Sequence, residues 1–248
     1  MDKVFGLNAV MAVLEHSVES VTCLYLDERR NDKRTSELEE LARNNNIKIE
    51  RVSRQQLNQS CPSNIQHQGV MLEKTATQPA EKMNLEDVLE NPEGPLFFLV
   101  LDGVQDPHNL GACLRSADAA GVTAVIAPKD KAVGLTPVVR KVASGAAETT
   151  AFIQVTNLAR TLRQLQDAGV WIIGSSGDAT QSLFETTFKG SVALVMGAEG
   201  KGIRRLTREL CDELIALPML GAVESLNVSV ATGICLYEVV RQRAIKTG

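Results

Sequence analysis

The chain has 248 residues, of which 44% are hydrophobic and 23% are charged, so it can bury a substantial core and does not have a disordered composition. Its formal net charge of -4 argues against a general nucleic-acid coat, which would need an excess of Lys and Arg. No apolar run is long enough to span a bilayer, and the start of the chain lacks the pattern of a signal peptide, so we expect a cytoplasmic protein with no membrane partner.

The cysteines and histidines do not form a metal-binding pattern. Five cysteines are scattered without a CxxC pair, and there are only three histidines. We therefore expect free, mostly buried thiols and no metal. Basic residues cluster locally at 33–34, at 51–54 and at 204–208. Each cluster taken alone is better explained as solvated surface than as a nucleic-acid patch.

Short helices and strands alternate over residues 1–75, which predicts a compact α/β unit. Apolar spacing predicts helices at 8–15 and 36–43, and strands at 21–26, 47–52 and 69–72. Residues 75–95 are polar and rich in Pro and Gly, with one short helical piece near 85–89. We therefore predict a domain at 1–75, a linker at 76–95 and a second domain at 96–248.

The second domain has the βα pattern of a parallel sheet with helices on both faces. The run at 96–102 is continuously apolar, as in a strand buried on both sides, and Trp171 is also expected in the core. A helix is expected at 110–120 and another after an Asn157 cap, with a loop around Gly145. The other strands are predicted at 122–127, 152–155, 170–174, 192–196 and at 215–217. Ligands on such sheets bind at the carboxyl ends of the strands.

The stretch from 217 to 238 contains a strand end, a loop and a helix. Leu226, Val230, Ile234 and Tyr237 follow helical spacing and predict one apolar face. Glu224, Ser225 and Asn227 surround the helix start, where an anion or other ligand can meet free backbone N–H groups. A simple helix cap explains either Ser225 or Asn227, but it needs only one of them.

Two further loops carry polar residues at predicted strand ends. GAEGKG at 197–202 matches neither a Walker loop nor GxGxxG, but its glycines predict close backbone approach, and Glu199 is a candidate ligand contact. His108 lies in the other loop without a nucleophile motif, and we rank it below its neighbours. Arg115 lies among small and apolar residues, so its guanidinium needs an anionic partner such as a phosphate.

Three segments together resemble the signature motifs of the SpoU/TrmH branch of the SPOUT methyltransferases. They are DPHNLGACLRSADAAG (106–121), LVMGAEGKGI (194–203) and LPMLGAVESLNVSVATGICLYE (217–238). The first 75 residues resemble the substrate-binding domain, similar to ribosomal protein L30, that precedes the catalytic domain in bacterial 23S rRNA guanosine 2′-O-methyltransferases. The resemblance therefore covers the whole chain.

This resemblance implies a fold that periodicity alone does not predict. The pattern of elements gives a plain doubly wound sheet, whereas the family ties the C-terminal part of its parallel sheet into a deep trefoil knot. Family members are homodimers and hold S-adenosylmethionine in the knot, largely through backbone groups. The positions that match here are Gly197, Leu217, Met219 and Leu226.

The implied reaction is methylation of the ribose 2′-hydroxyl of a guanosine in 23S rRNA. Arg115 matches the residue nearest the hydroxyl; because a guanidinium stays protonated, we expect it to bind the adjoining phosphate and lower the pKa of the hydroxyl. Asn109 would position Arg115 or the ribose, and Glu199, Ser225 and Asn227 would complete the polar site. The amino-terminal domain would grip folded RNA.

Three alternatives compete with this interpretation. The protein could methylate a tRNA ribose, or could bind RNA on the same fold without catalysis. The five polar residues of the expected site argue against a pure binding protein. A nicotinamide-dependent dehydrogenase is disfavoured because the glycine fingerprint is missing after the first strand of the sheet.

Overall fold

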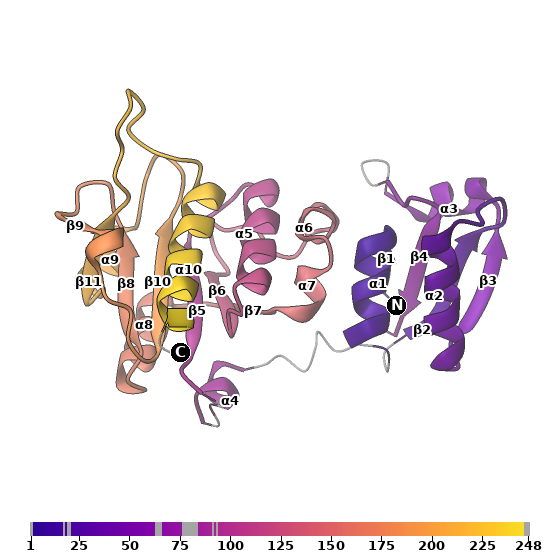
Figure 1. The fold of residues 1–248 in the computed structure, drawn as a ribbon, viewed down its shortest axis with the longest axis horizontal. Coiled ribbons are helices and arrows are strands. Elements are labelled where there is room, and N and C mark those ends of the chain that lie inside the picture. Colours follow the sequence, from indigo (N-terminus) through magenta and orange to yellow (C-terminus); the bar gives the residue numbers. More distant parts are fainter. Residues whose placement is uncertain are drawn as a thin grey trace. The chain divides into compact units, whose positions relative to one another are not determined.

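The computed structural model describes residues 2–16, 18, 21–62, 66–75, 84–90, 92 and 94–245 (Figure 1). The chain divides into two compact units, one of Met1–Lys82 with Leu135–Thr149 and one of Met83–Gly134 with Thr150–Gly248. Half of the predicted linker, residues 76–83, 91 and 93, lies outside the described residues. The division is not continuous along the chain, because a segment between two strands of the second unit packs with the first.

The first unit contains a mixed four-stranded sheet with the order β1-β4-β2-β3. Strand β2 pairs with β3 in parallel and with β4 antiparallel, and β1 pairs antiparallel with β4 at the edge. The helices and strands predicted here are confirmed, while β1 and α3 were not predicted. The strands are β1 (Asp2–Phe5), β2 (Val21–Asp27), β3 (Lys48–Val52) and β4 (Val70–Lys74), and the helices are α1 (Leu7–His16), α2 (Lys33–Asn44) and α3 (Arg54–Ser60).

The region around Gly145, predicted as a loop, instead contains helices α6 (Pro137–Ala143) and α7 (Ala146–Thr149). Helix α6 begins at Pro137 because Thr136 accepts a hydrogen bond from the Val139 N–H and so caps it. Gly145 has a φ of +103° and lies so close to α1 that an added Cβ would be 2.7 Å from the Cβ of Ala12. Glycine therefore allows α7 to contact α1.

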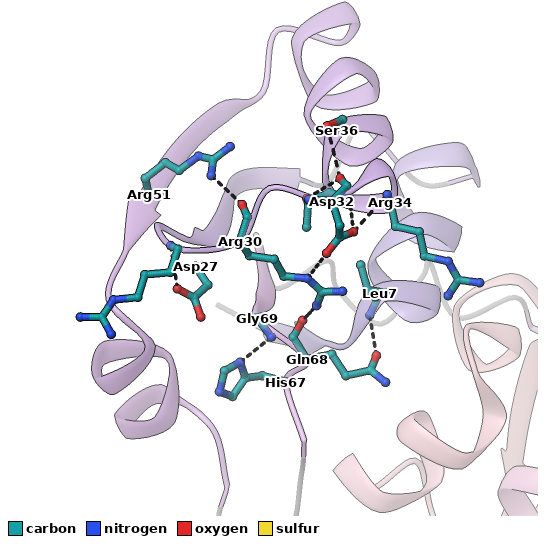
Figure 2. A network of polar contacts seen from close by, with 12 residues as sticks. Leu7, Asp27, Arg30, Asp32, Arg34, Ser36, Arg51, His67, Gln68 and Gly69 are labelled. Carbon is teal, nitrogen blue, oxygen red and sulfur yellow. Dashed lines mark hydrogen bonds and ion pairs between the residues drawn. The ribbon is translucent and has the colours of Figure 1, made fainter.

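A polar network holds the loop before β4 (Figure 2). The Arg30 side chain binds both the Asp32 carboxylate and the backbone oxygen of Gln68. The Gln68 side-chain oxygen accepts a hydrogen bond from the Leu7 N–H at 3.1 Å. Arg51 donates to the backbone oxygen of Arg30 at 2.9 Å and also pairs with a carboxylate. The arginines of this region therefore serve partly to fix its own loops.

The second unit contains a seven-stranded sheet in which every paired neighbour is parallel, as predicted. The strand order is β7-β6-β5-β10-β8-β11-β9, so β10 is inserted between β5 and β8. The strands are β5 (Phe97–Asp102), β6 (Ala124–Pro128), β7 (Ala151–Val155), β8 (Trp171–Ser175), β9 (Gln181–Ser182), β10 (Val192–Gly197) and β11 (Glu213–Ala216).

Helices cover both faces of this sheet. Helices α5 (Pro107–Ala119) and α10 (Val228–Ile245) pack against each other (Figure 1). The Arg243 guanidinium of α10 lies 4.8 Å from the ring centroid of Phe97, a residue of β5. Helices α4 (Leu85–Glu90) and α8 (Leu158–Asp167) pack on the opposite face, in one cluster with Phe98. Helix α9 (Arg205–Glu209) and the 3₁₀ turn η3 (Leu183–Glu185) complete the described elements of this unit.

Two predictions about local structure need correction. Helix α5 begins at Pro107 and not at 110, because Asp106 caps it by accepting a hydrogen bond from the His108 N–H. Trp171 was expected in the core but is 50% exposed, since it stands at the amino end of β8. The predicted apolar face of the last helix, whose orientation the sequence left open, points outward, and its Tyr237 is 51% exposed.

The last helix is apolar on two sides. Val228, Ala231, Cys235 and Val239 form the side buried within the unit, whereas Val230 stays half-exposed. Spacing alone cannot tell which of two apolar stripes meets the sheet. No helix of the described ranges is long and apolar enough to cross a membrane.

Candidate active site

Three strands bring their carboxyl ends to one edge of the second sheet. Asp102 ends β5 and Gly197 ends β10, and these two residues are directly paired in the parallel register. Strand β11 lies two places from β10 in the strand order. It ends at Ala216 and leads into the long loop that precedes α10. The three segments singled out in the sequence therefore all begin at the edge where parallel sheets bind ligands.

A chain of side-chain hydrogen bonds joins these three segments. The Asn109 amide nitrogen donates to a Glu199 carboxylate oxygen at 3.3 Å. The Asn227 amide nitrogen donates to the Asn109 amide oxygen at 2.9 Å. The Asn227 oxygen in turn accepts from the Ser229 N–H at 2.9 Å and from its hydroxyl at 2.6 Å. Helix α5, the loop after β10 and the start of α10 are thus connected by polar contacts.

Ser229 and Glu199 stand at the two ends of this series of hydrogen bonds. Their chemistry fixes which side-chain atom of each asparagine donates and which accepts. A backbone N–H can only donate, so Asn227 must present its oxygen to Ser229 and its nitrogen to Asn109. Asn109 must then accept with its oxygen, which leaves its nitrogen for the Glu199 carboxylate. Asn109 is buried, whereas Glu199 and Asn227 are exposed. The buried amide thus uses one acceptor and one donor to tie two exposed groups together.

Asn227 also caps α10, as the simple explanation of this residue requires. Its side-chain oxygen accepts the Ser229 N–H, and its backbone oxygen accepts the Ala231 N–H at 3.0 Å. Ser225 is exposed and makes no hydrogen bond to another described residue. The structure therefore brings Asn109, Glu199 and Asn227 into one group and does not connect Ser225 to it.

The loop after β10 is closed on itself. The Ala198 N–H donates to the Gly202 oxygen at 3.1 Å, and the Gly202 N–H donates to the Ala198 oxygen at 2.9 Å. A Cβ added to Gly197 would lie 2.0 Å from the carbonyl carbon of Gly202, so no larger residue fits there. Gly200 adopts a φ of +73° in the same turn. The close backbone approach predicted from these glycines is confirmed, although the loop approaches itself.

Asp102 anchors the far end of this loop. Its side chain is fully buried; one carboxylate oxygen accepts the Arg204 N–H at 2.9 Å, and the other lies 3.4 Å from the Arg204 Nε. The second oxygen forms no well-directed hydrogen bond to a described residue, so the ion pair is its main compensation. The sequence reasoning missed this pair, although an Asp at the end of a buried strand was a visible signal.

The loop between β11 and α10 offers backbone groups to a ligand. Leu217, Met219 and Leu226 are half-buried, and Leu220 is 99% exposed (the golden loop in Figure 1). The backbone of 217–226 forms no hydrogen bond with the described residues. Free N–H and C=O groups beside half-buried apolar side chains suit a ligand with a heteroaromatic base, as S-adenosylmethionine has. The residues present therefore fit the cofactor that the motifs imply.

Arg115 takes no part in the hydrogen bonds that join Glu199, Asn109 and Asn227. It is exposed on α5 and forms no hydrogen bond or ion pair with a described residue. Asn109 directs both ends of its side chain to Glu199 and Asn227, so no bond supports the idea that Asn109 positions Arg115 directly. An exposed guanidinium without a protein partner is free to bind an anionic ligand.

Other candidates have structural explanations. His108 is exposed and its N–H serves the Asp106 cap. The basic cluster at 204–208 is paired with carboxylates of Asp102, Glu209 and Asp178. These contacts favour the interpretation of that cluster as structural surface.

The thiols beneath this site are not nucleophiles. Cys113 donates to the Thr232 hydroxyl at 3.6 Å between α5 and α10, and burial raises the pKa of Cys113 to about 11. Burial likewise raises the pKa of Cys235 to about 12. No disulfide joins the five cysteines, all of which are described, and Cys23, Cys113 and Cys235 are buried, as predicted. No group of metal-binding side chains occurs among the described residues.

Two family models match the chain. The SpoU rRNA Methylase family matches residues 96–237, and the RNA 2'-O ribose methyltransferase substrate binding model matches residues 3–80. The chain is 51% identical to the 23S rRNA (guanosine-2'-O-)-methyltransferase RlmB of Pseudomonas putida, over 99% of this chain and 98% of the relative. It is 53% identical to the enzyme of the same name from Shewanella oneidensis, over 98% of each chain.

Solved structures share the fold. The SpoU methyltransferase AviRb from Streptomyces viridochromogenes, crystallised with AdoMet, matches with a TM-score of 0.78 at 23% identity, over 98% of this chain and 90% of that one. The A. aeolicus TrmH/SpoU tRNA modifying enzyme matches with a TM-score of 0.57 at 30% identity, over 68% of this chain and 85% of that one. The chain belongs to the SpoU rRNA methylase family.

Proposed function

We propose that this protein transfers a methyl group from S-adenosylmethionine to the ribose 2′-hydroxyl of a guanosine in 23S rRNA. The observation that supports the proposal most strongly is a pair of hydrogen bonds, from Asn227 to Asn109 and from Asn109 to Glu199. They join the three motif segments at one edge of the sheet. The choice of rRNA is supported by the two near-full-length relatives named above.

The residues of this chain divide the work between binding the cofactor and binding the RNA. Gly197, Leu217, Met219 and Leu226 would hold S-adenosylmethionine, largely through the backbone groups that the structure leaves unpaired. When bound, the cofactor supplies an electrophilic methyl group and its own leaving group, so no covalent enzyme intermediate is needed. The protein's task is to place the ribose oxygen in line with that methyl group.

Arg115 acts on the hydroxyl as a permanently charged cation. Its exposed guanidinium would bind the phosphate next to the target ribose and stabilise the negative charge that develops on the oxygen as the proton leaves. Asn109 and Asn227 hold the Glu199 loop against α5 and α10, and Ser225 adds a polar group at the exposed loop. These residues form the polar side of the site.

The larger organisation is proposed in the same terms. Residues 1–75 form an L30-like domain that grips the RNA, residues 76–95 link it to the methyltransferase domain at 96–248, and the C-terminal sheet is tied in a deep trefoil knot. The protein works as a homodimer in the cytoplasm. The half-exposed apolar residues Val230 and Tyr237 on the outward side of α10 support a subunit interface there.

The test is methyl transfer from radiolabelled S-adenosylmethionine to unmodified 23S rRNA and, separately, to unmodified bulk tRNA. Nuclease digestion then maps the label. Label on the ribose of one 23S guanosine is the expected result. Label on tRNA would keep the chemistry and overturn the substrate, and cofactor binding without transfer to either RNA or to ribosomal particles would favour a binding protein.

A further inference from the structure

The first compact unit contains a basic cavity. Its lining includes none of the hydrogen-bonded residues Glu199, Asn109 and Asn227 of the second sheet. Its volume is about 410 Å³, which is in the range of small-ligand sites. Four cations line it, namely Lys3, Lys74, Arg140 and Lys141, and no carboxylate of the described residues does. On a chain with a net charge of -4, this concentration of positive charge calls for an anionic ligand.

One buried carboxylate fixes two of these cations in the cavity wall. Glu148, whose side chain is 5% exposed, binds the Lys74 ammonium with one oxygen and the Arg140 guanidinium with the other. A single negative charge thus serves two positive ones, so one positive charge has no carboxylate of its own among the described residues. Lys3 and Lys141 form no ion pair with another described residue. Two of the lining cations are therefore held in place by Glu148, and the other two have no ion pair with a described residue.

The rest of the lining is apolar and includes an edge strand. Phe5 and Leu135 are half-buried, and Val4 and Ala9 are buried. Strand β1 pairs only with β4 among the described strands, so the outer side of its backbone can donate and accept hydrogen bonds. Cations for a phosphate, apolar surface for a planar ring and backbone groups for the ring's polar edge together match one unstacked nucleotide.

We propose that this cavity binds a single-stranded nucleotide of the RNA substrate, with its phosphate at the four cations and its base against Phe5 and Leu135. The proposal rests on the proposed function for the identity of the RNA. It assigns the site to residues from distant parts of the sequence, since Lys3 lies on β1, Lys74 on β4, and Arg140 and Lys141 on α6. Glu148 is a positioning residue that holds Lys74 and Arg140.

The test compares neutral substitutions in the full-length protein. Lys3→Ala with Lys141→Ala should weaken binding to unmodified 23S rRNA about tenfold and should lower the slope of log affinity against log salt by about one for each lost phosphate contact. The matched control is Lys33→Ala with Arg34→Ala, which removes the same charge from exposed positions of the same unit outside the cavity. The control should bind nearly as well as the wild type.

A second variant keeps the charge and fills the space. Leu135→Trp should weaken rRNA binding while leaving the salt slope unchanged, because it blocks the base and keeps the cations. In transfer assays, both cavity variants should raise the KM for RNA more than they lower kcat, with unchanged binding of S-adenosylmethionine.

The two proposals fail in different ways. If the wild type methylates rRNA and the cavity variants bind it like the control, the cavity assignment is wrong and the function stands. If the wild type methylates no rRNA but the cavity variants lose RNA binding selectively, the cavity assignment stands and the function is wrong. Saturable binding of adenosine monophosphate with unaltered RNA binding by the variants would identify a free-nucleotide site and overturn the inference.

Discussion

The amide nitrogen of Asn227 lies 2.9 Å from the amide oxygen of Asn109, although 118 residues separate them in the chain. This one contact joins the start of α10 to the first turn of α5. Because Asn109 also binds Glu199, the same amide links all three segments that carry the family motifs. The site therefore depends on a partly buried polar network, in which each member needs its partners.

Substitutions of Asn227 should separate its two roles. Asn227→Ala removes the cap as well as the bond to Asn109, so we expect a loss of about 1 kcal/mol in unfolding free energy together with reduced methyl transfer. Asn227→Asp keeps an acceptor for the Ser229 N–H but puts a carboxylate against the Asn109 oxygen. It should retain most of the stability and still reduce transfer. Denaturant unfolding and transfer assays on both variants test this; equal loss of stability in both would show that the cap contributes nothing and that the bond to Asn109 accounts for the loss.

Arg115→Ala should abolish methyl transfer while leaving cofactor binding and stability nearly intact. The side chain is exposed and has no partner among the described residues, so its removal should change the unfolding free energy by less than about 0.5 kcal/mol. Calorimetric titration with S-adenosylmethionine, thermal unfolding and single-turnover transfer measure the three quantities. If cofactor binding falls as much as transfer, the assigned role of Arg115 is wrong.

Gly197→Ala should disrupt the loop after β10. The new Cβ would lie 2.2 Å from the Ile203 nitrogen, and backbone cannot yield as a flexible side chain can. We expect at least about 2 kcal/mol of destabilisation, typical of overpacking, and loss of cofactor binding. Gly177→Ala is the matched control, because no heavy atom lies within 4 Å of its added Cβ. A Gly197→Ala protein with wild-type melting and cofactor affinity would contradict the observed loop.

The loop before β4 should loosen as the pH falls. His67 accepts the Gly69 N–H with Nδ1 at 3.0 Å, so Nδ1 is unprotonated and the ring is neutral, with Nε2 donating to the Asn58 side-chain oxygen (Figure 2 shows the Gly69 contact). Burial, reinforced by the nearby Arg54 and opposed by Asp27, lowers the pKa of His67 below its ordinary value.

The sign of the pH effect follows from that direction. The unfolded chain takes up a proton near pH 6.5, before the folded one does. The stabilisation is complete above this pH and is lost as the pH falls below it. Amide exchange at 66–70 should therefore accelerate between pH 7.5 and 5.5, after correction for intrinsic rates. His67→Gln, which retains acceptor and donor groups but does not titrate, should lack this acceleration.

The sequence by itself determined most of the elements and the identity of the motifs. Alternating polarity and apolar runs predict both the parallel sheet and the α/β character of the first unit, because burial periodicity is a local property. Cap residues such as Asn157 mark where helices start. Glu199 and Asn227 were found as polar residues in loops that follow predicted strands, and Asn109 was found through the resemblance of its segment to the family motif.

Only the tertiary structure decided which of these residues meet. No local pattern predicts that Asn109 binds Asn227 rather than Arg115, because the choice depends on how α5 and α10 pack. The outward direction of Tyr237 was undetermined for the same reason, since α10 has two apolar sides and only the sheet selects one. The packing of residues 135–149 with the first unit requires the Gly145 contact with α1, a close approach between segments more than 130 residues apart. Sequence patterns report the burial of each element, whereas pairwise contacts depend on the whole fold.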